Sequence, residues 1–86
     1  MKYGYITYCN LAEGMTLEKL PKEMDRVKSE AEKYGIKLLY WGHRFGVSEG
    51  FAAVFKSEKG MDNYFKFLME VERPYTACRT NTVIIP

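Results

Sequence analysis

The chain has 86 residues, of which 47% are hydrophobic, and its 13 basic and 11 acidic side chains give a formal net charge of +2. This length predicts a single domain over residues 1–86 with a thin core, because a chain of this size buries only about 60–65% of its unfolded surface. The interspersed charges argue against an electrostatic funnel for nucleic acid, and no apolar run reaches the roughly 20 residues of a membrane span.

The start of the chain leads into a strand pattern without the features of a signal peptide, so we expect a cytoplasmic protein. Gln is absent, whereas Lys, Glu, Tyr and Ile are common. This bias is typical of proteins from thermophiles. A thermophilic source would be compatible with a disulfide in the cytoplasm.

The first part of the chain predicts a strand followed by an amphipathic helix. Residues 3–9 are rich in β-formers, and residues 10–14 are typical of a loop. Pro21 is tolerated in the first turn of a helix, so we expect the helix to begin near Leu20, and Gly35 to end it. Between residues 17 and 34, apolar residues recur at steps of three and four, as on a helix packed against a sheet: Leu17, Leu20, Met24, Val27, Ala31 and Tyr34.

Two central strands are predicted at residues 36–43 and 50–56, joined by a hairpin connection over residues 44–49. Both strands are apolar at odd and even positions alike, which a sheet with one solvated face does not need. Helices can cover only one face of such a sheet. We therefore expect its outer face to pack on a second copy of the chain, as a homodimer.

The last part of the chain predicts a second helix and a long final strand. Ser57 is a suitable N-cap for a helix over residues 58–70, and residues 75–85 predict a strand with an interruption near Asn81. The side chains expected to point inward from this helix are Met61, Tyr64, Phe65 and Leu68. The order βαββαβ predicts a ferredoxin-like α+β sandwich, with a four-stranded antiparallel sheet and two helices on one face.

In this order and length the whole chain resembles the dimeric α+β barrel superfamily, whose small ferredoxin-like subunits pack their sheets back to back. Its members include cofactor-independent monooxygenases, isomerases, haem-handling proteins and stress-response proteins, so the resemblance alone assigns no activity. The resemblance implies a homodimer and a small-molecule pocket between the sheet and the helices of each subunit. No cofactor is expected.

Five residues have the chemistry of a polar-tipped aromatic pocket. His43 is the only histidine and lies at the end of a predicted strand, which makes it the candidate for proton transfer. The residue types that would hold a flat phenolic or quinoid ligand are Asn10, Tyr40, Trp41 and Arg79. The alternatives are a strand-end histidine bonded to backbone or water, and aromatic side chains that only fill the core and the interface. No zinc-ligand spacing surrounds the histidine, so no metal site is predicted.

The two cysteines are predicted to meet. Cys9 ends the first strand and Cys78 lies early in the last one, and these strands are antiparallel neighbours in the ferredoxin-like order 4-1-3-2. Two states fit this placement. The cysteines form a disulfide, or they remain buried thiols that act as small hydrophobes.

RNA-recognition domains share the order βαββαβ and are the main nucleic-acid alternative. Residues 49–55 are similar to the strand-three motif of those domains, but Glu49 replaces its basic residue and Ala53 replaces a stacking aromatic. We therefore expect no nucleic-acid partner. The leading hypothesis is a small-molecule-binding protein, in its most specific form a cofactor-independent enzyme acting on an aromatic or apolar substrate. The alternative is a non-catalytic structural or regulatory module.

Overall fold

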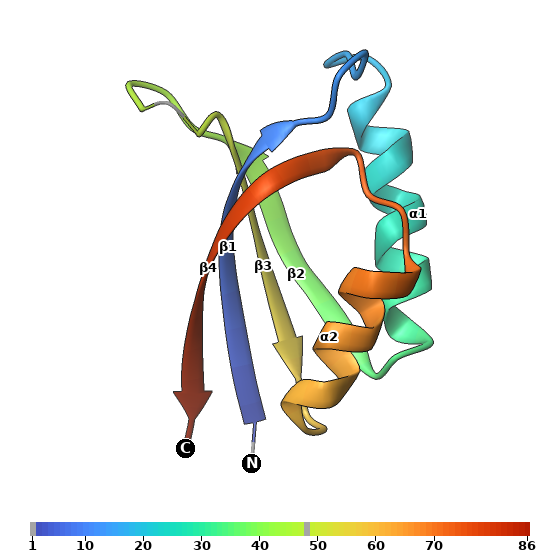
Figure 1. Cartoon of the computed structure of the whole chain (residues 1–86), viewed down its shortest axis with the longest axis vertical. Coiled ribbons are helices and arrows are strands. Elements are labelled where there is room, and N and C mark those ends of the chain that lie inside the picture. The colour runs from blue at the N-terminus through green and yellow to red at the C-terminus, as the bar shows by residue number, and fades with distance from the viewer. Residues whose placement is uncertain (1, 48) are drawn as a thin grey trace.

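The described residues form strands and helices in the order strand, helix, strand, strand, helix, strand (Figure 1). The computed structural model describes residues 2–47 and 49–86. The elements are β1 Lys2–Leu11, α1 Leu20–Glu32, β2 Ile36–His43, β3 Phe51–Ser57, α2 Met61–Glu70 and β4 Tyr75–Ile85. This arrangement confirms the predicted α+β class.

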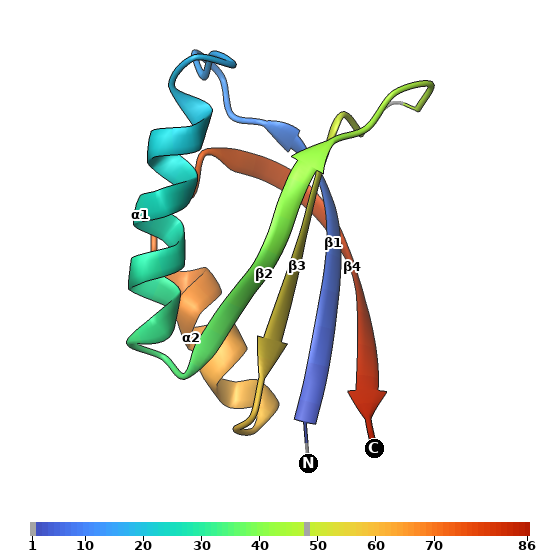
Figure 2. The same cartoon turned by 180° about the vertical axis from the view of Figure 1, so that it is seen from behind.

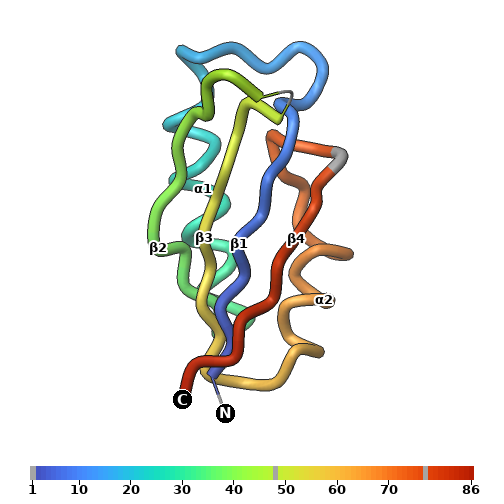
Figure 3. The backbone as a smooth tube through the Cα atoms, turned by 90° about the vertical axis from the view of Figure 1, so that its left-hand side faces the viewer, coloured from blue at the N-terminus to red at the C-terminus, as the bar shows by residue number. Residues whose placement is uncertain are grey.

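The strands in the described part of the chain pair in one antiparallel sheet of order β2-β3-β1-β4 (Figure 3). Both helices lie on the same side of this sheet, and its other side is left uncovered (Figures 1 and 2). We call these sides the helix-facing side and the outer face. β4 runs through Asn81 without the predicted break, and the register of β1 on β4 instead shifts between Tyr8 and Asn10.

The core lies between the sheet and the helices because alternate residues of β1 and β3 point toward the helices. Tyr5, Phe51 and Phe55 are completely or almost completely buried there. From α1 the buried side chains are Leu20, Met24, Val27 and Ala31. The ring of Tyr64 in α2 stacks on that of Tyr5, with centroids 3.8 Å apart.

Two predicted features of α1 differ in outcome. Pro21 occupies the first turn, and Gly35 follows the helix with a positive φ of 76°, as predicted from the missing N–H of proline and the freedom of glycine. Leu17, predicted in the buried stripe, is 64% exposed. The prediction failed there because Leu17 precedes the first helical turn, so the helical periodicity does not apply to it.

The second helix begins later than predicted. Ser57 ends β3 and is not an N-cap; its hydroxyl accepts a hydrogen bond from the Lys59 N–H at 3.3 Å and donates one to the Lys59 carbonyl at 3.1 Å. These bonds close a turn, and Gly60 then precedes the first helical residue. The serine hydroxyl is therefore used in the turn and not at the helix end.

The inward face of α2 also differs from the predicted one. Tyr64 is buried as predicted, and Phe67 is buried although the prediction did not include it. Met61 and Phe65, predicted to point inward, are exposed. Neither helix of the described residues is long and apolar enough to cross a membrane.

Candidate functional site

The strand register places Tyr40 and Trp41 on opposite sides of the sheet. Trp41 lies opposite Ala53, which is buried on the helix-facing side, whereas Tyr40 lies opposite Val54 on the outer face. The pairing of β2 with β3 is irregular between Leu38 and Tyr40. This irregularity sets which of the two aromatic rings reaches the helices.

The remaining predicted pocket residues are also divided between the two sides. His43 lies opposite Phe51 and belongs to the helix-facing side, whereas Arg79 lies opposite Tyr8 and belongs to the outer face with Asn10. The structure therefore brings Trp41 and His43 together. It does not form one pocket lined by all five predicted residues, because strand alternation places Asn10, Tyr40 and Arg79 on the outer face; Tyr40, on the edge strand β2, still lines a groove together with Trp41.

An aromatic wall crosses the helix-facing side at the end of the sheet nearest the β2–β3 connection. It consists of Tyr75, Phe51, Trp41 and His43, in that order. Successive ring centroids lie 4.9, 6.0 and 6.0 Å apart. The first two rings are buried, Trp41 is half-buried and His43 is exposed. The wall is thus a row of ring contacts, stacked from Tyr75 to Trp41 and edge-to-face at His43, whose exposed end carries an imidazole.

A groove lies beside this wall, between α1 and β2. Its volume is about 250 Å³, and its lining residues are Met24, Asp25, Lys28, Leu38, Leu39, Tyr40 and Trp41. This volume is slightly below the roughly 300–1,000 Å³ typical of ligand pockets. The groove combines apolar side chains of the sheet with charged groups of the helix.

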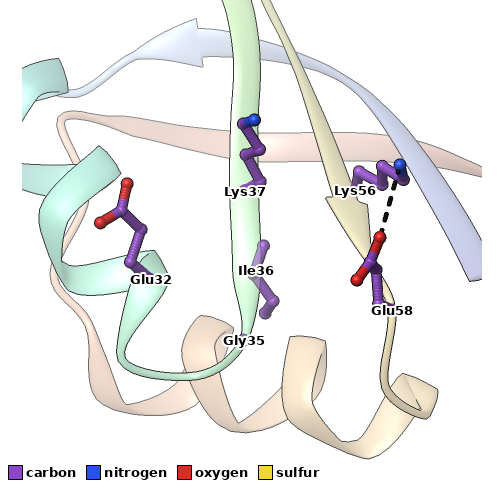
Figure 4. A pocket seen from close by; sticks show the side chains of 6 residues that line it. All are labelled: Glu32, Gly35, Ile36, Lys37, Lys56 and Glu58. Carbon is purple, nitrogen blue, oxygen red and sulfur yellow. Dashed lines mark ion pairs between the residues drawn. The ribbon is translucent and has the colours of Figure 1, made fainter.

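A larger cavity of about 450 Å³ lies at the opposite end of the β2–β3 pair (Figure 4). Its lining is strongly charged, and the residues are Glu32, Gly35, Ile36, Lys37, Lys56 and Glu58. The ammonium group of Lys56 lies 3.7 Å from a carboxylate oxygen of Glu58. This cavity has no aromatic side chain in its lining, so it lacks the chemistry predicted for a flat apolar ligand.

The outer face carries a cluster of charged groups around one tyrosine, which we call the outer-face cluster. The guanidinium carbons of Arg44 and Arg79 lie 4.3 and 4.8 Å from the centroid of the Tyr8 ring. Glu49 bridges the two cations: it accepts two hydrogen bonds from Arg79, at 2.9 and 3.3 Å, and its Oε1 lies 3.6 Å from Nη1 of Arg44. Cation–π and ionic contacts together tie the β2–β3 connection to β1 and β4.

Sequence reasoning identified only Arg79 as a site residue within this cluster. Arg44 and Glu49 are predicted surface charges when taken singly, and Tyr8 is one of several strand aromatics. The missing information is the register, which places Tyr8 directly opposite Arg79. Cross-strand pairing of this kind depends on tertiary structure and not on local spacing.

We expect the carboxyl group of Glu49 to titrate below its ordinary pKa of 4.5, because Arg79 hydrogen-bonds and attracts its charged form. The resulting stabilisation is complete above that ordinary pKa and is lost as pH falls through the lowered value. An NMR titration of the side-chain carboxyl carbons measures the pKa of Glu49. Arg79→Gln should raise the pKa, whereas Lys33→Gln, which removes an exposed cation of α1, should not; an unchanged value in Arg79→Gln would contradict the assignment.

The buried tyrosines are unsuited to act as bases. Burial raises the pKa of Tyr64 to about 12 and also raises the pKa of Tyr5 and Tyr75. The hydroxyls of Tyr5 and Tyr75 have no hydrogen-bond partner among the described residues. These phenols therefore stay protonated near neutral pH.

Cys9 and Cys78 are joined by a disulfide between β1 and β4. This is the bonded one of the two states that the sequence left open. Cys9 is completely buried, and its sulfur lies 3.3 Å from the hydroxyl oxygen of Thr7. The bond connects an edge strand of the sheet to a central one.

No group of three or more His, Cys, Asp or Glu side chains among residues 2–47 and 49–86 is arranged to hold a metal ion. Comparison of the chain with models of known protein families gives no match, and comparison with curated proteins gives no significant match.

Proposed function

We propose that the protein is a small-molecule-binding protein of the ferredoxin-like, dimeric α+β barrel type, which forms a homodimer through the outer face of its sheet. The ligand is a flat aromatic or apolar molecule that lies beside Trp41. The observation that carries the proposal is the aromatic wall, which is buried at Tyr75 and open at His43. The half-buried indole ring of Trp41 leaves apolar surface with which a ligand can make contact.

The composition of the groove supports this class of ligand. Trp41 lines both the groove and the wall, so one face of a bound ring can stack on the indole. His43 is not part of the groove lining but lies at the exposed end of the aromatic wall, with its ring centroid 6.0 Å from that of Trp41. An imidazole in this position can donate a hydrogen bond to a phenolic or quinone oxygen, or accept a proton from a phenol.

The outer face supports the dimer. Its centre is formed by Ile6, Ala52 and Val54, which no helix covers. Tyr40 beside them is 67% exposed. Contiguous exposed apolar surface surrounded by charged groups is typical of protein interfaces, and the charged groups here belong to the outer-face cluster and to Lys37 and Lys56. A second copy of the chain would bury the apolar centre and leave these charges at the rim.

We expect Val54→Asp to convert the dimer into a monomer, because it places a carboxylate at the centre of the proposed interface. Val54 lies on the outer face, so the helix-facing core keeps all of its side chains. Sedimentation equilibrium of the wild type and the variant measures the association state. Ser29→Asp on the exposed surface of α1 is the matched control and should remain dimeric. A monomeric, folded wild type would exclude the proposed dimer.

Trp41 is the only tryptophan of the chain, so its fluorescence reports directly on the proposed site. We expect 1,4-naphthoquinone to quench it saturably, with one binding site per subunit. His43→Ala should weaken binding about fivefold, the effect of one hydrogen bond of about 1 kcal/mol, without unfolding the protein. Phe65→Ala removes an exposed ring of α2 and should leave binding unchanged. Quenching that never saturates, equal in all variants, would favour a non-catalytic interaction module.

A further inference from the structure

The two halves of the Cys9–Cys78 disulfide differ sharply in accessibility. Cys9 belongs to the central strand β1 and is completely buried, whereas Cys78 belongs to the edge strand β4 and is exposed. A thiolate that attacks a disulfide must reach one sulfur and displace the other. Of the two residues, Cys78 is the one with exposed surface, so the side from which an external thiol can approach is that of Cys78, with Cys9 as the leaving sulfur.

The leaving sulfur has a built hydrogen-bond donor. Thr7 is 1% exposed, and its Oγ1 lies 3.3 Å from Sγ of Cys9. Because a disulfide sulfur carries no hydrogen, the hydroxyl of Thr7 is the donor. The same oxygen accepts a hydrogen bond of 3.0 Å from the Thr80 hydroxyl, which directs the Thr7 hydrogen toward the sulfur. A hydrogen bond to sulfur favours its charged form and so stabilises a thiolate at Cys9.

The backbone around the bond is already irregular. The register of β1 on β4 shifts between Tyr8 and Asn10, on either side of Cys9. At such a shift the ladder of backbone hydrogen bonds is interrupted. Opening the disulfide therefore breaks less of the sheet here than it would in a regular part of the ladder.

From these three observations we propose that Cys9–Cys78 is a thiol–disulfide exchange site whose reaction partner is a thiol small enough to reach the edge of β4. The thiolate of the partner attacks Sγ of Cys78. A new sulfur–sulfur bond forms between the partner and Cys78, the Cys9–Cys78 bond breaks, and its electron pair leaves with Cys9. The resulting thiolate accepts the hydrogen bond of Thr7.

A second thiolate completes the reaction by attacking the partner's sulfur in the mixed disulfide. Cys78 leaves as a thiolate, and the two partner thiols leave joined as a disulfide. The protein has then gained two electrons, and two thiols have been oxidised. The reverse sequence reoxidises the protein. This chemistry is separate from the proposed ligand site and does not depend on it.

The site is tested first on the wild-type protein in a glutathione redox buffer, with acid quenching and peptide mapping by mass spectrometry. We expect glutathione on Cys78 and not on Cys9. The single variants extend the test: folded Cys9→Ser should take up one glutathione from its oxidised form, and folded Cys78→Ser should take up none. When urea unfolds them, both variants should take up glutathione. A wild-type disulfide that resists reduction while folded, or glutathione on Cys9, would overturn the proposal and leave the bond as a structural link.

The role of Thr7 as a positioning residue is tested by Thr7→Val, which keeps the shape and removes the hydroxyl. We expect reduction of the folded protein by glutathione to slow about tenfold or more, the effect of one hydrogen bond to a charged group. Thr82→Val on β4 removes a hydroxyl that does not contact the disulfide and should leave the rate unchanged. Equal rates in the two variants, with circular dichroism like that of the wild type, would refute the role of Thr7.

Discussion

Replacing Cys9 and Cys78 together with alanine is expected to lower the free energy of unfolding by about 4 kcal/mol. The two cysteines are 69 positions apart in the sequence, so the bond closes a loop that includes most of the chain. Such a link restricts the unfolded chain, and the restriction grows with the length of the loop. Alanine keeps the buried position of Cys9 apolar, so the loss reports mainly on the link.

Urea unfolding measures this effect in three samples: the oxidised wild type, the wild type reduced with dithiothreitol, and the double variant. The two samples without the bond should unfold at similar, much lower urea concentrations. The slope of the transition should also increase, because an unlinked chain exposes more surface when it unfolds. Equal stability of the oxidised and the reduced wild type would contradict the expected role of the bond.

The second large effect is expected at the centre of the core. Phe55→Ala should lower the free energy of unfolding by roughly 3–5 kcal/mol, because it removes a completely buried ring and leaves a cavity. Phe55 belongs to the central strand β3, and its ring centroid lies 5.9 Å from that of Tyr64 and 5.5 Å from that of Phe67. The change therefore loosens the contact of α2 with the sheet.

The chain offers a matched control for this prediction. Phe45 lies in the β2–β3 connection and is 91% exposed, so Phe45→Ala removes the same ring without creating a cavity. Its effect should stay within about 0.5 kcal/mol, as for most surface changes. Thermal or urea unfolding of both variants measures the two losses of stability. Equal losses would mean that the buried position of one ring or the exposed position of the other is wrong.

Periodicity predicted α1 well because its signals agree with one another. The apolar stripe, the proline in the first turn and the glycine after the last turn all specify the same helix. The second helix was placed less well because Ser57 satisfies two patterns at once. It is typical of an N-cap, and it also continues the alternation of β3, where it is buried between Tyr3 and Ile36 of the neighbouring strands. The pairing of Ser57 with both neighbouring strands places it in β3 and not at the start of α2.

The candidate site was predictable only in part. The sequence identified Trp41 and His43, which the structure places together, since both residue types and their position near a strand end are local features. It could not show which of Tyr40 and Trp41 faces the helices, because the irregularity in the pairing of β2 that decides this has no local signature. The outer-face cluster was missed for the same reason. Its members come from β1, β4 and the β2–β3 connection, and only the register brings them together.

The covalent tie between β1 and β4 also restricts how copies of this protein can exchange parts. β4 is an edge strand of the sheet, the kind of element that identical subunits can swap with one another. While the disulfide is closed, β4 is bound to its own chain and cannot pair with the β1 of another copy in its place. Domain swapping through this strand therefore requires prior reduction, and the oxidised protein assembles only through surfaces that each copy already presents.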